Sequence, residues 1–148
     1  MQLCCICTND EIMRACEILQ RHKLKRTACR EGIINLLLQD SMALSEHEIK
    51  EHFIGSFDRT TFYRSFKTLL ECNIIHKIVI DQQTVKYALD NSFGLRGDHP
   101  HFFCEGCKSI WCIENIPVKM PELPKGFESK EMKMLISGSC FNCKILNA

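Results

Sequence analysis

Apolar side chains recur every three or four residues through the first half of the chain, which is the spacing of amphipathic helices. This pattern predicts one helix over residues 10–22 and a second over residues 28–39. Thr27 is suited to cap the second helix, because a threonine hydroxyl can accept a hydrogen bond from the first turn. The apolar positions that define these two helices are Ile12, Cys16, Leu19, Ile33, Ile34, Leu37 and Leu38.

Two further helices follow in quick succession. Ser45 and Glu48 have the S-x-x-E spacing of a capping box, which predicts a short helix with Ile49 and Phe53 on its apolar face. Gly55 lies in the turn after this helix, and Asp58 is suited to cap the next one, over residues 59–71. The apolar stripe of that helix consists of Phe62, Phe66, Leu69 and Leu70.

A short helix, a turn with glycine and a helix with polar residues on its exposed face predict a helix-turn-helix motif that reads DNA. Arg64 could contact a guanine edge or a phosphate, and hydroxyl groups suit phosphate oxygens. The basic run over residues 21–30 is either a solvated turn or a second phosphate contact. The residues expected to contact DNA are Lys25, Arg26, Arg59, Thr60, Thr61, Tyr63, Arg64 and Lys67.

Residues 74–80 and 84–89 alternate as two strands joined by a turn, which predicts a β-hairpin directly after the recognition helix. Such a hairpin is a wing, from which Lys77 or Lys86 could reach backbone phosphates. We therefore expect a winged helix-turn-helix domain over residues 1–90. Residues 91–98 contain two glycines and are expected to form a hinge before a second, smaller domain over residues 99–148.

Four cysteines in the last third of the chain form two C-x2-C pairs, Cys104 with Cys107 and Cys140 with Cys143. Two such pairs can complete a tetrahedral site in which thiolates bind zinc at about 2.3 Å. Two disulfides or a thioredoxin-like redox pair are the alternatives. A redox pair should open a helix after a strand, and neither pair is followed by a helical pattern, so we expect a structural zinc ion.

A second metal site is suggested by His99 and His101, which alternate onto one side of an extended segment. Cys112 can join them if strands over residues 101–104 and 109–113 pair around the first C-x2-C turn. An exposed polar pair is the alternative for the two histidines. Prolines make a long helix over residues 114–125 unfavourable, and residues 127–136 are expected to form the last strand.

Composition narrows the class of protein. The 148 residues carry a net charge of +1, so any attraction to nucleic acid must come from local patches. No apolar run is long enough to span a bilayer, and the first residues do not form a signal peptide. Eleven cysteines without an export signal indicate reduced thiols or metal ligands, and hence a cytoplasmic protein. Cys4, Cys5 and Cys7 near the start are expected to belong to a frayed terminus, although they could bind metal or become oxidised.

Several short motifs, taken in order, resemble the ferric uptake regulator family of bacterial transcription factors. They cover the chain from Leu24 to Cys143. The resemblance implies an α+β protein with a winged-helix DNA-binding half and a small α/β dimerisation half with a Cys4 zinc site. It also implies homodimers on palindromic operators, usually as repressors that respond to a metal or to peroxide. The motifs are Leu24-Lys-Arg-Thr27, Leu44-Ser-Glu-His-Glu-Ile49, Arg59-Thr-Thr-Phe-Tyr-Arg64, His99-Pro-His101, Gly126-Phe127 and the two C-x2-C pairs.

The chain departs from the family at the positions that would hold the sensed metal. Where the resemblance implies a histidine before the Ser45 helix and an acidic residue at the end of the wing, this chain has Ala43 and Ala88. Cys112 stands where an acidic ligand is implied, and Met132 stands where a further site would have a histidine. A thiolate in place of a carboxylate favours zinc, Cu(I) or similar soft ions over manganese or iron.

We therefore expect a dimeric transcriptional regulator, with structural zinc and DNA binding set by a metal at His99, His101 and Cys112. Two alternatives remain: a redox-responsive or constitutive DNA-binding regulator, or a zinc-stabilised protein-interaction module. Catalysis is not expected, because a closed Cys4 site has no open position for a substrate and no catalytic motif is present. No small-molecule substrate or membrane partner is expected either.

Overall fold

The computed structural model describes residues 9–40, 42–90, 99–113, 116, 118–130 and 132–146. The chain divides into two compact units, Met1–Asp90 and Asn91–Ala148. The expected hinge over residues 91–98 and the expected frayed terminus with Cys4, Cys5 and Cys7 lie outside the described residues. Among the residues described, no helix is long and apolar enough to cross a lipid bilayer.

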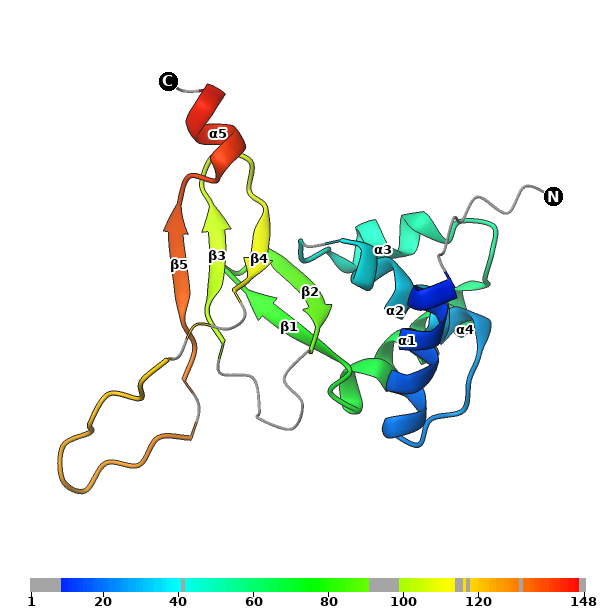
Figure 1. Ribbon diagram of the computed structural model, residues 1–148, viewed down its shortest axis with the longest axis horizontal. Helices are drawn as coiled ribbons and strands as arrows, with labels where there is room; N and C mark the ends of the chain where they lie inside the picture. Colours follow the sequence, from blue (N-terminus) through cyan, green and yellow to red (C-terminus); the bar gives the residue numbers. More distant parts are fainter. Residues whose placement is uncertain are drawn as a thin grey trace. The chain divides into compact units, whose positions relative to one another are not determined.

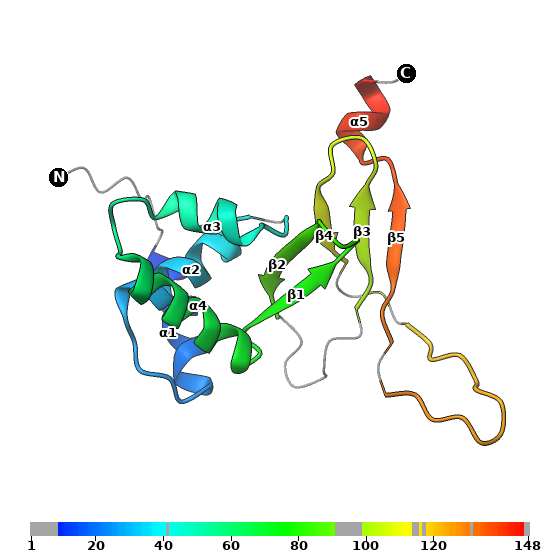
Figure 2. The same ribbon diagram turned by 180° about the vertical axis from the view of Figure 1, so that it is seen from behind.

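The first unit consists of four helices followed by a β-hairpin (Figures 1 and 2). The boundaries lie within a residue or two of those predicted from the sequence. The helices are α1 (Asn9–Arg21), α2 (Ala28–Gln39), α3 (Glu46–His52) and α4 (Arg59–Glu71), and the strands are β1 (Ile75–Val79) and β2 (Val85–Leu89).

The helix starts that the sequence predicted are confirmed. Thr27 accepts a hydrogen bond from the backbone N–H of Arg30 at 3.3 Å. Ser45 and Glu48 form a complete capping box, with each side chain bound to the backbone of the other residue. These local bonds satisfy N–H groups that a helix leaves unpaired in its first turn, so short polar segments fix where the helices begin.

One apolar core joins the helices to the hairpin. Phe62, Phe66 and Leu69 of the predicted apolar stripe of α4 are buried, and Leu70 is half-buried against the same core. The Phe66 ring packs edge-on against Tyr87 of β2 with centroids 4.9 Å apart. Leu44 and Tyr87 exchange backbone hydrogen bonds of 2.9 and 2.7 Å, so the segment before α3 adds a rung to the wing. The wing is thus fixed to the helical body by both packing and backbone pairing.

The second unit is a three-stranded sheet in the order β4-β3-β5, followed by a short helix (Figure 1). β3 (His101–Cys104) pairs antiparallel with β4 (Ile110–Cys112), as the sequence predicted, and parallel with β5 (Leu135–Gly138). Between β4 and β5 the described residues form neither helix nor strand. They run out beyond the end of the sheet opposite α5 (Phe141–Leu146).

Two sequence predictions about this unit are wrong. The last strand begins at Leu135 and not at residue 127, because β5 extends only as far as its pairing with β3. The second C-x2-C pair is followed by a helix, since α5 begins at Phe141 and contains Cys143. The strand-then-helix argument against a redox pair therefore does not apply to Cys140 and Cys143.

The second unit has a very small core. Among its described residues only Pro100, Cys104 and Ile110 are buried. The sheet gives little apolar burial, and β5 is exposed along most of its length. A unit of this size with so few buried side chains requires a metal or a partner to remain folded.

We predict that Glu48→Gln destabilises the first unit by about 1 kcal/mol at neutral pH, because the carboxylate charge that pairs with Lys86 and strengthens the bond from the Ser45 N–H is lost. Burial opposes ionisation of Glu48, but its bonds to Lys86 and Ser45 outweigh this and lower its pKa. The stabilisation is thus present above the ordinary value of 4.5 and is lost as the pH falls through the lowered pKa. Denaturant titration of both proteins at pH 7 and near pH 3 measures this. Glu46→Gln, which alters the same turn without a cap bond, is the control, and a Glu48→Gln deficit that stays constant with pH contradicts the prediction.

Candidate metal centres and DNA-binding surface

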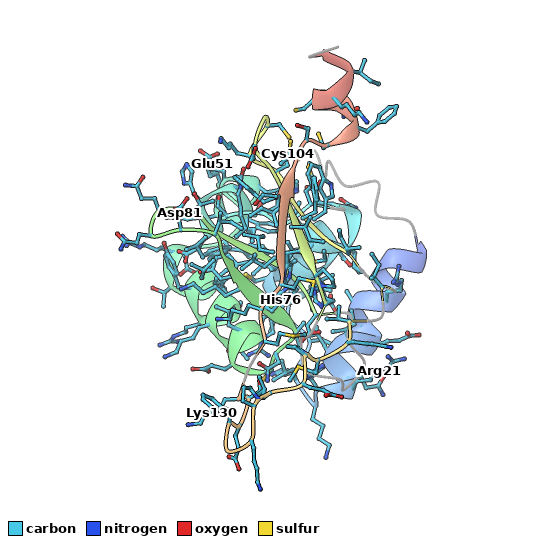
Figure 3. The ribbon with its side chains drawn as sticks, turned by 90° about the vertical axis from the view of Figure 1, so that its left-hand side faces the viewer. Arg21, Glu51, His76, Asp81, Cys104 and Lys130 are labelled. Carbon is cyan, nitrogen blue, oxygen red and sulfur yellow. The ribbon has the colours of Figure 1, made fainter. Side chains whose placement is uncertain are left out.

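Four thiols converge at the end of the three-stranded sheet where α5 begins. Cys104 ends β3, and Figure 3 labels it at this junction. The sulfur atoms of Cys104, Cys107, Cys140 and Cys143 all lie within 4.8 Å of one another. The Cys107 and Cys140 sulfurs are 3.8 Å apart, which is the separation of about 3.8 Å expected for two thiolates on a tetrahedral zinc with bonds of about 2.3 Å.

The backbone around the first C-x2-C pair is folded to fit this centre. Lys108 donates from its N–H to the Cys104 carbonyl at 2.8 Å, which closes the turn, and Lys108 adopts a positive φ of 61°. A Cβ atom on Gly106 would lie 2.9 Å from the Cys143 sulfur. The absence of a side chain at Gly106 therefore allows the second pair to approach the first.

Hydrogen bonds distribute the protons unevenly over the four thiols. The N–H groups of Cys107 and then Cys140 lower the pKa of the Cys104 thiol to about 6, and the Cys140 bond to its sulfur is 3.3 Å long. The bond with Ser109 lowers the pKa of Cys107. The bonds with Cys140 and then Cys104 raise the pKa of Cys143 to about 12, because a thiol that donates to a neighbouring sulfur is favoured in its protonated form. A divalent cation can take the place of the shared protons, so the four sulfurs fit a closed zinc site better than a single redox pair.

A second cluster lies at the other end of β3. The ligand atoms of His99, His101 and Cys112 lie within 4.8 Å of one another, and the two imidazole centroids are 4.7 Å apart. The pairing of β3 with β4 produces this proximity, because His101 and Cys112 are directly opposite each other in the register. Two imidazoles and one thiolate suit zinc or another soft ion. The structure thus brings together all three side chains that the sequence proposed.

His76 is an imidazole to which the sequence analysis gave no role. It lies in β1 opposite Ala88 of β2, and residues directly opposite in antiparallel strands share a face. Ala88 is the position where the family resemblance implies an acidic metal ligand. The hairpin therefore carries a histidine beside the position that lacks the carboxylate. Only the strand register shows that the two positions are neighbours.

The expected DNA-binding residues on α4 are mostly accessible. Arg59, Thr60, Arg64 and Lys67 are exposed, and Tyr63 is half-buried. Lys67 lies 3.7 Å from Glu71, an exposed pair that contributes little and can be displaced.

Thr61, which the sequence suggested as a phosphate contact, is bonded within the protein. Its backbone N–H and its hydroxyl donate to the two carboxylate oxygens of Asp58 at 3.0 and 2.5 Å. The hydroxyl proton is thus already used at the start of α4. The hydroxyl bond and then the backbone bond lower the pKa of Asp58.

Two further basic candidates are engaged within the protein. Lys86 is only 18% exposed and pairs with Glu48 at 2.6 Å, which makes it less available to a phosphate. Lys77 is exposed and remains a candidate in the wing. In the basic run, Arg26 pairs with Glu31, whereas Lys25 is exposed.

Comparison with known proteins identifies a family. The ferric uptake regulator family matches residues 21–136 of this chain. No curated protein sequence matches.

Solved structures share the fold. A zinc uptake regulator complexed with zinc and DNA is 18% identical, with a TM-score of 0.66, over 97% of this chain and 99% of that chain. The ferric uptake regulator of Helicobacter pylori, which has three functional metal binding sites, is 19% identical, with a TM-score of 0.54, over 93% of this chain and 94% of that chain. A zinc-bound manganese uptake regulator is 14% identical, with a TM-score of 0.58, over 84% of this chain and 97% of that chain.

We predict that Gly106→Ala weakens zinc retention, because the added methyl group would meet the Cys143 sulfur and Cβ. Release of zinc to a chelator should become about tenfold faster, a cost typical of disturbing the surroundings of a metal ligand. Zinc content measured against time with a colorimetric chelator tests this. Glu105→Ala, an exposed change in the same turn, should behave as the wild type does. Wild-type retention by Gly106→Ala would show that the two C-x2-C pairs do not close on one ion.

Proposed function

The chain belongs to the ferric uptake regulator family of transcription regulators, which are not enzymes, and we propose that it is a homodimeric repressor controlled by a soft metal ion. The ion binds at His99, His101 and Cys112, and structural zinc binds at the four converging cysteines. The protein acts in the cytoplasm, where its cysteines stay reduced. The observation that carries the proposal most directly is the exposed polar face of α4 beside a wing.

DNA reading is assigned to the first turns of α4. In helix-turn-helix proteins the N-terminal residues of the second helix enter the major groove. Arg64 can form a bidentate bond with guanine, and Arg59, Thr60 and Lys67 suit phosphates. Asp58 at the helix start does not present a free carboxylate to the DNA, because both of its oxygens accept bonds from Thr61.

Dimerisation is assigned to the exposed edge of the small sheet. Leu135 and Ile136 of β5 are 42% and 41% exposed, and β5 has no strand on its outer side among the described residues. An exposed apolar edge strand favours pairing with another chain. A second copy would supply the burial that this unit lacks, and a two-fold dimer matches a palindromic operator.

The metal is assigned a conformational role. His99 directly follows the expected hinge over residues 91–98. An ion held by His99, His101 and Cys112 would therefore restrict the direction of the chain at the end of the hinge. Half-sites on DNA lie about one helical turn apart, and two heads with a restricted spacing bind them at a lower ordering cost. For a switch, the ion must bind the DNA-competent form better by a few kcal/mol.

The main alternative is a redox-responsive or constitutive regulator, which keeps the DNA-binding assignment and removes the metal sensor. Cys112 is half-buried and is the thiol of the second cluster, so its oxidation would disturb the same segment. The interaction-module alternative leaves the exposed basic face of α4 without a role and is less well supported.

We predict that Arg64→Ala weakens specific operator binding by about 1–3 kcal/mol, because a bidentate arginine–guanine contact is lost. Fluorescence anisotropy with DNA from the upstream region of its own gene, at fixed salt and with zinc present, measures this. Lys125→Ala removes the same charge from an exposed position in the second unit and serves as the control. Equal affinities of wild type and Arg64→Ala would exclude α4 as the reading helix.

We predict that His101→Ala abolishes the response of operator binding to added metal, while structural zinc is retained. Wild type should gain at least about tenfold in affinity with one of Zn, Cu(I), Fe(II) or Mn, which is about 1.4 kcal/mol of coupling. A metal response that survives His101→Ala unchanged would show that this cluster is not the sensor. Tight binding that no ion alters, but that peroxide abolishes, would favour the redox alternative.

A further inference from the structure

The ring of Tyr63 is approached by two cations from two different helices. The ammonium nitrogen of Lys50, in the last turn of α3, lies 5.4 Å from the ring centroid. The guanidinium carbon of Arg59, the first residue of α4, lies 5.6 Å from the same centroid. Both distances are within the roughly 6 Å at which the negative face of an aromatic ring attracts a cation.

Lys50 is the more informative of these two cations. It is half-buried, and no carboxylate of the described residues lies within ion-pair distance of it. Lys67 and Lys86, by contrast, both have a glutamate partner. The C-terminal turn of α3 favours a cation by its dipole, but that field does not direct the cation toward one ring. The Tyr63 contact accounts for where the Lys50 ammonium group lies.

We propose that Lys50 is a positioning residue for DNA recognition, which holds the Tyr63 ring in its DNA-competent orientation before the DNA arrives. This inference rests on the proposed function, because it requires α4 to read DNA. Tyr63 lies on the flank of α4 and is half-buried, so part of it stays accessible while Lys50 holds the ring. A side chain ordered in the free protein loses less freedom on binding.

The competing role for Lys50 is a direct phosphate contact, and the two roles differ in their dependence on salt. A lysine that neutralises a phosphate releases a counterion, so its removal reduces the slope of log affinity against log salt by about 1. A lysine that acts only through Tyr63 changes the affinity without changing that slope. It also has no effect once the Tyr63 ring has been removed.

The test compares wild type, Lys50→Met, Tyr63→Leu and the double variant on operator DNA at several salt concentrations. We expect Lys50→Met to weaken operator binding two- to fivefold, the range for an exposed cation–π contact, with an unchanged salt slope. In the Tyr63→Leu background the same change should have no further effect. Lys125→Met is the control for lost charge, and thermal melting of each variant confirms that it folds.

Each other outcome overturns the proposal. A slope reduced by about 1, with a Lys50→Met effect that persists in the Tyr63→Leu background, makes Lys50 a phosphate contact. Unchanged operator affinity of Lys50→Met makes the contact irrelevant to DNA binding.

A measurement on the free protein separates this proposal from the proposed function. The ring current of Tyr63 should shift the Lys50 side-chain protons upfield in the NMR spectrum, and Tyr63→Leu should remove that shift. No shift in the wild type contradicts the positioning contact even if the protein binds DNA. Absence of operator binding by the wild type contradicts the DNA-binding function, and Lys50 then has no role in recognition.

Discussion

The convergence of four thiols on one point is the constraint on which the second half of this protein depends. Its three-stranded sheet buries so few side chains that apolar packing alone cannot hold the sheet and α5 together. The closed Cys4 zinc site that we propose would contribute folding free energy directly and would replace the missing core. Gly106 shows how closely the backbone is fitted to this centre, since even a methyl group there would meet Cys143.

The two metal clusters are linked by a single strand. β3 begins at His101, in the candidate regulatory cluster, and ends at Cys104, in the structural one. Its pairing with β4 places Cys112 opposite His101, so the candidate regulatory ligands are presented by a sheet whose far end carries the Cys4 cluster. Loss of structural zinc should therefore dismantle both clusters, whereas loss of the regulatory ion leaves the Cys4 centre intact. This asymmetry suits one ion that is permanent and one that is exchanged.

The first unit is stabilised by different means. Its helices and wing share one apolar core, and capping bonds, the Leu44–Tyr87 rung and the Glu48–Lys86 pair join neighbouring elements. None of these contacts requires a metal ion. The DNA-binding surface can therefore stay folded while the metal state of the second unit changes, as a regulator requires. On the proposed function, the alanines at positions 43 and 88 and the thiolate at 112 would alter which ion is sensed and would leave the recognition helix unchanged.

The sequence alone determined the features that depend on local chemistry. Thr27, Ser45 and Asp58 fix helix starts through bonds to residues three positions away, so the helix boundaries of the first unit could be predicted. The spacing of the two C-x2-C pairs likewise identified four residues that the tertiary structure brings together. Pairing of β3 with β4 was also predictable, because only a short turn separates the two strands.

Tertiary structure decided what depends on partners distant in the sequence. The limits of β5 follow from its parallel pairing with β3. The helix α5 could not be predicted, because its six residues are too few to show a helical pattern. Lys86 is one of two candidate phosphate contacts in the sequence, and only the fold shows its pairing with Glu48, 38 residues away. His76 gained significance only from its register with Ala88, and Lys50 only from the Tyr63 ring on the next helix. Spacing along the chain identifies residues that could bind a metal or DNA. Whether another residue of the protein already binds them depends on contacts that form only when the chain folds.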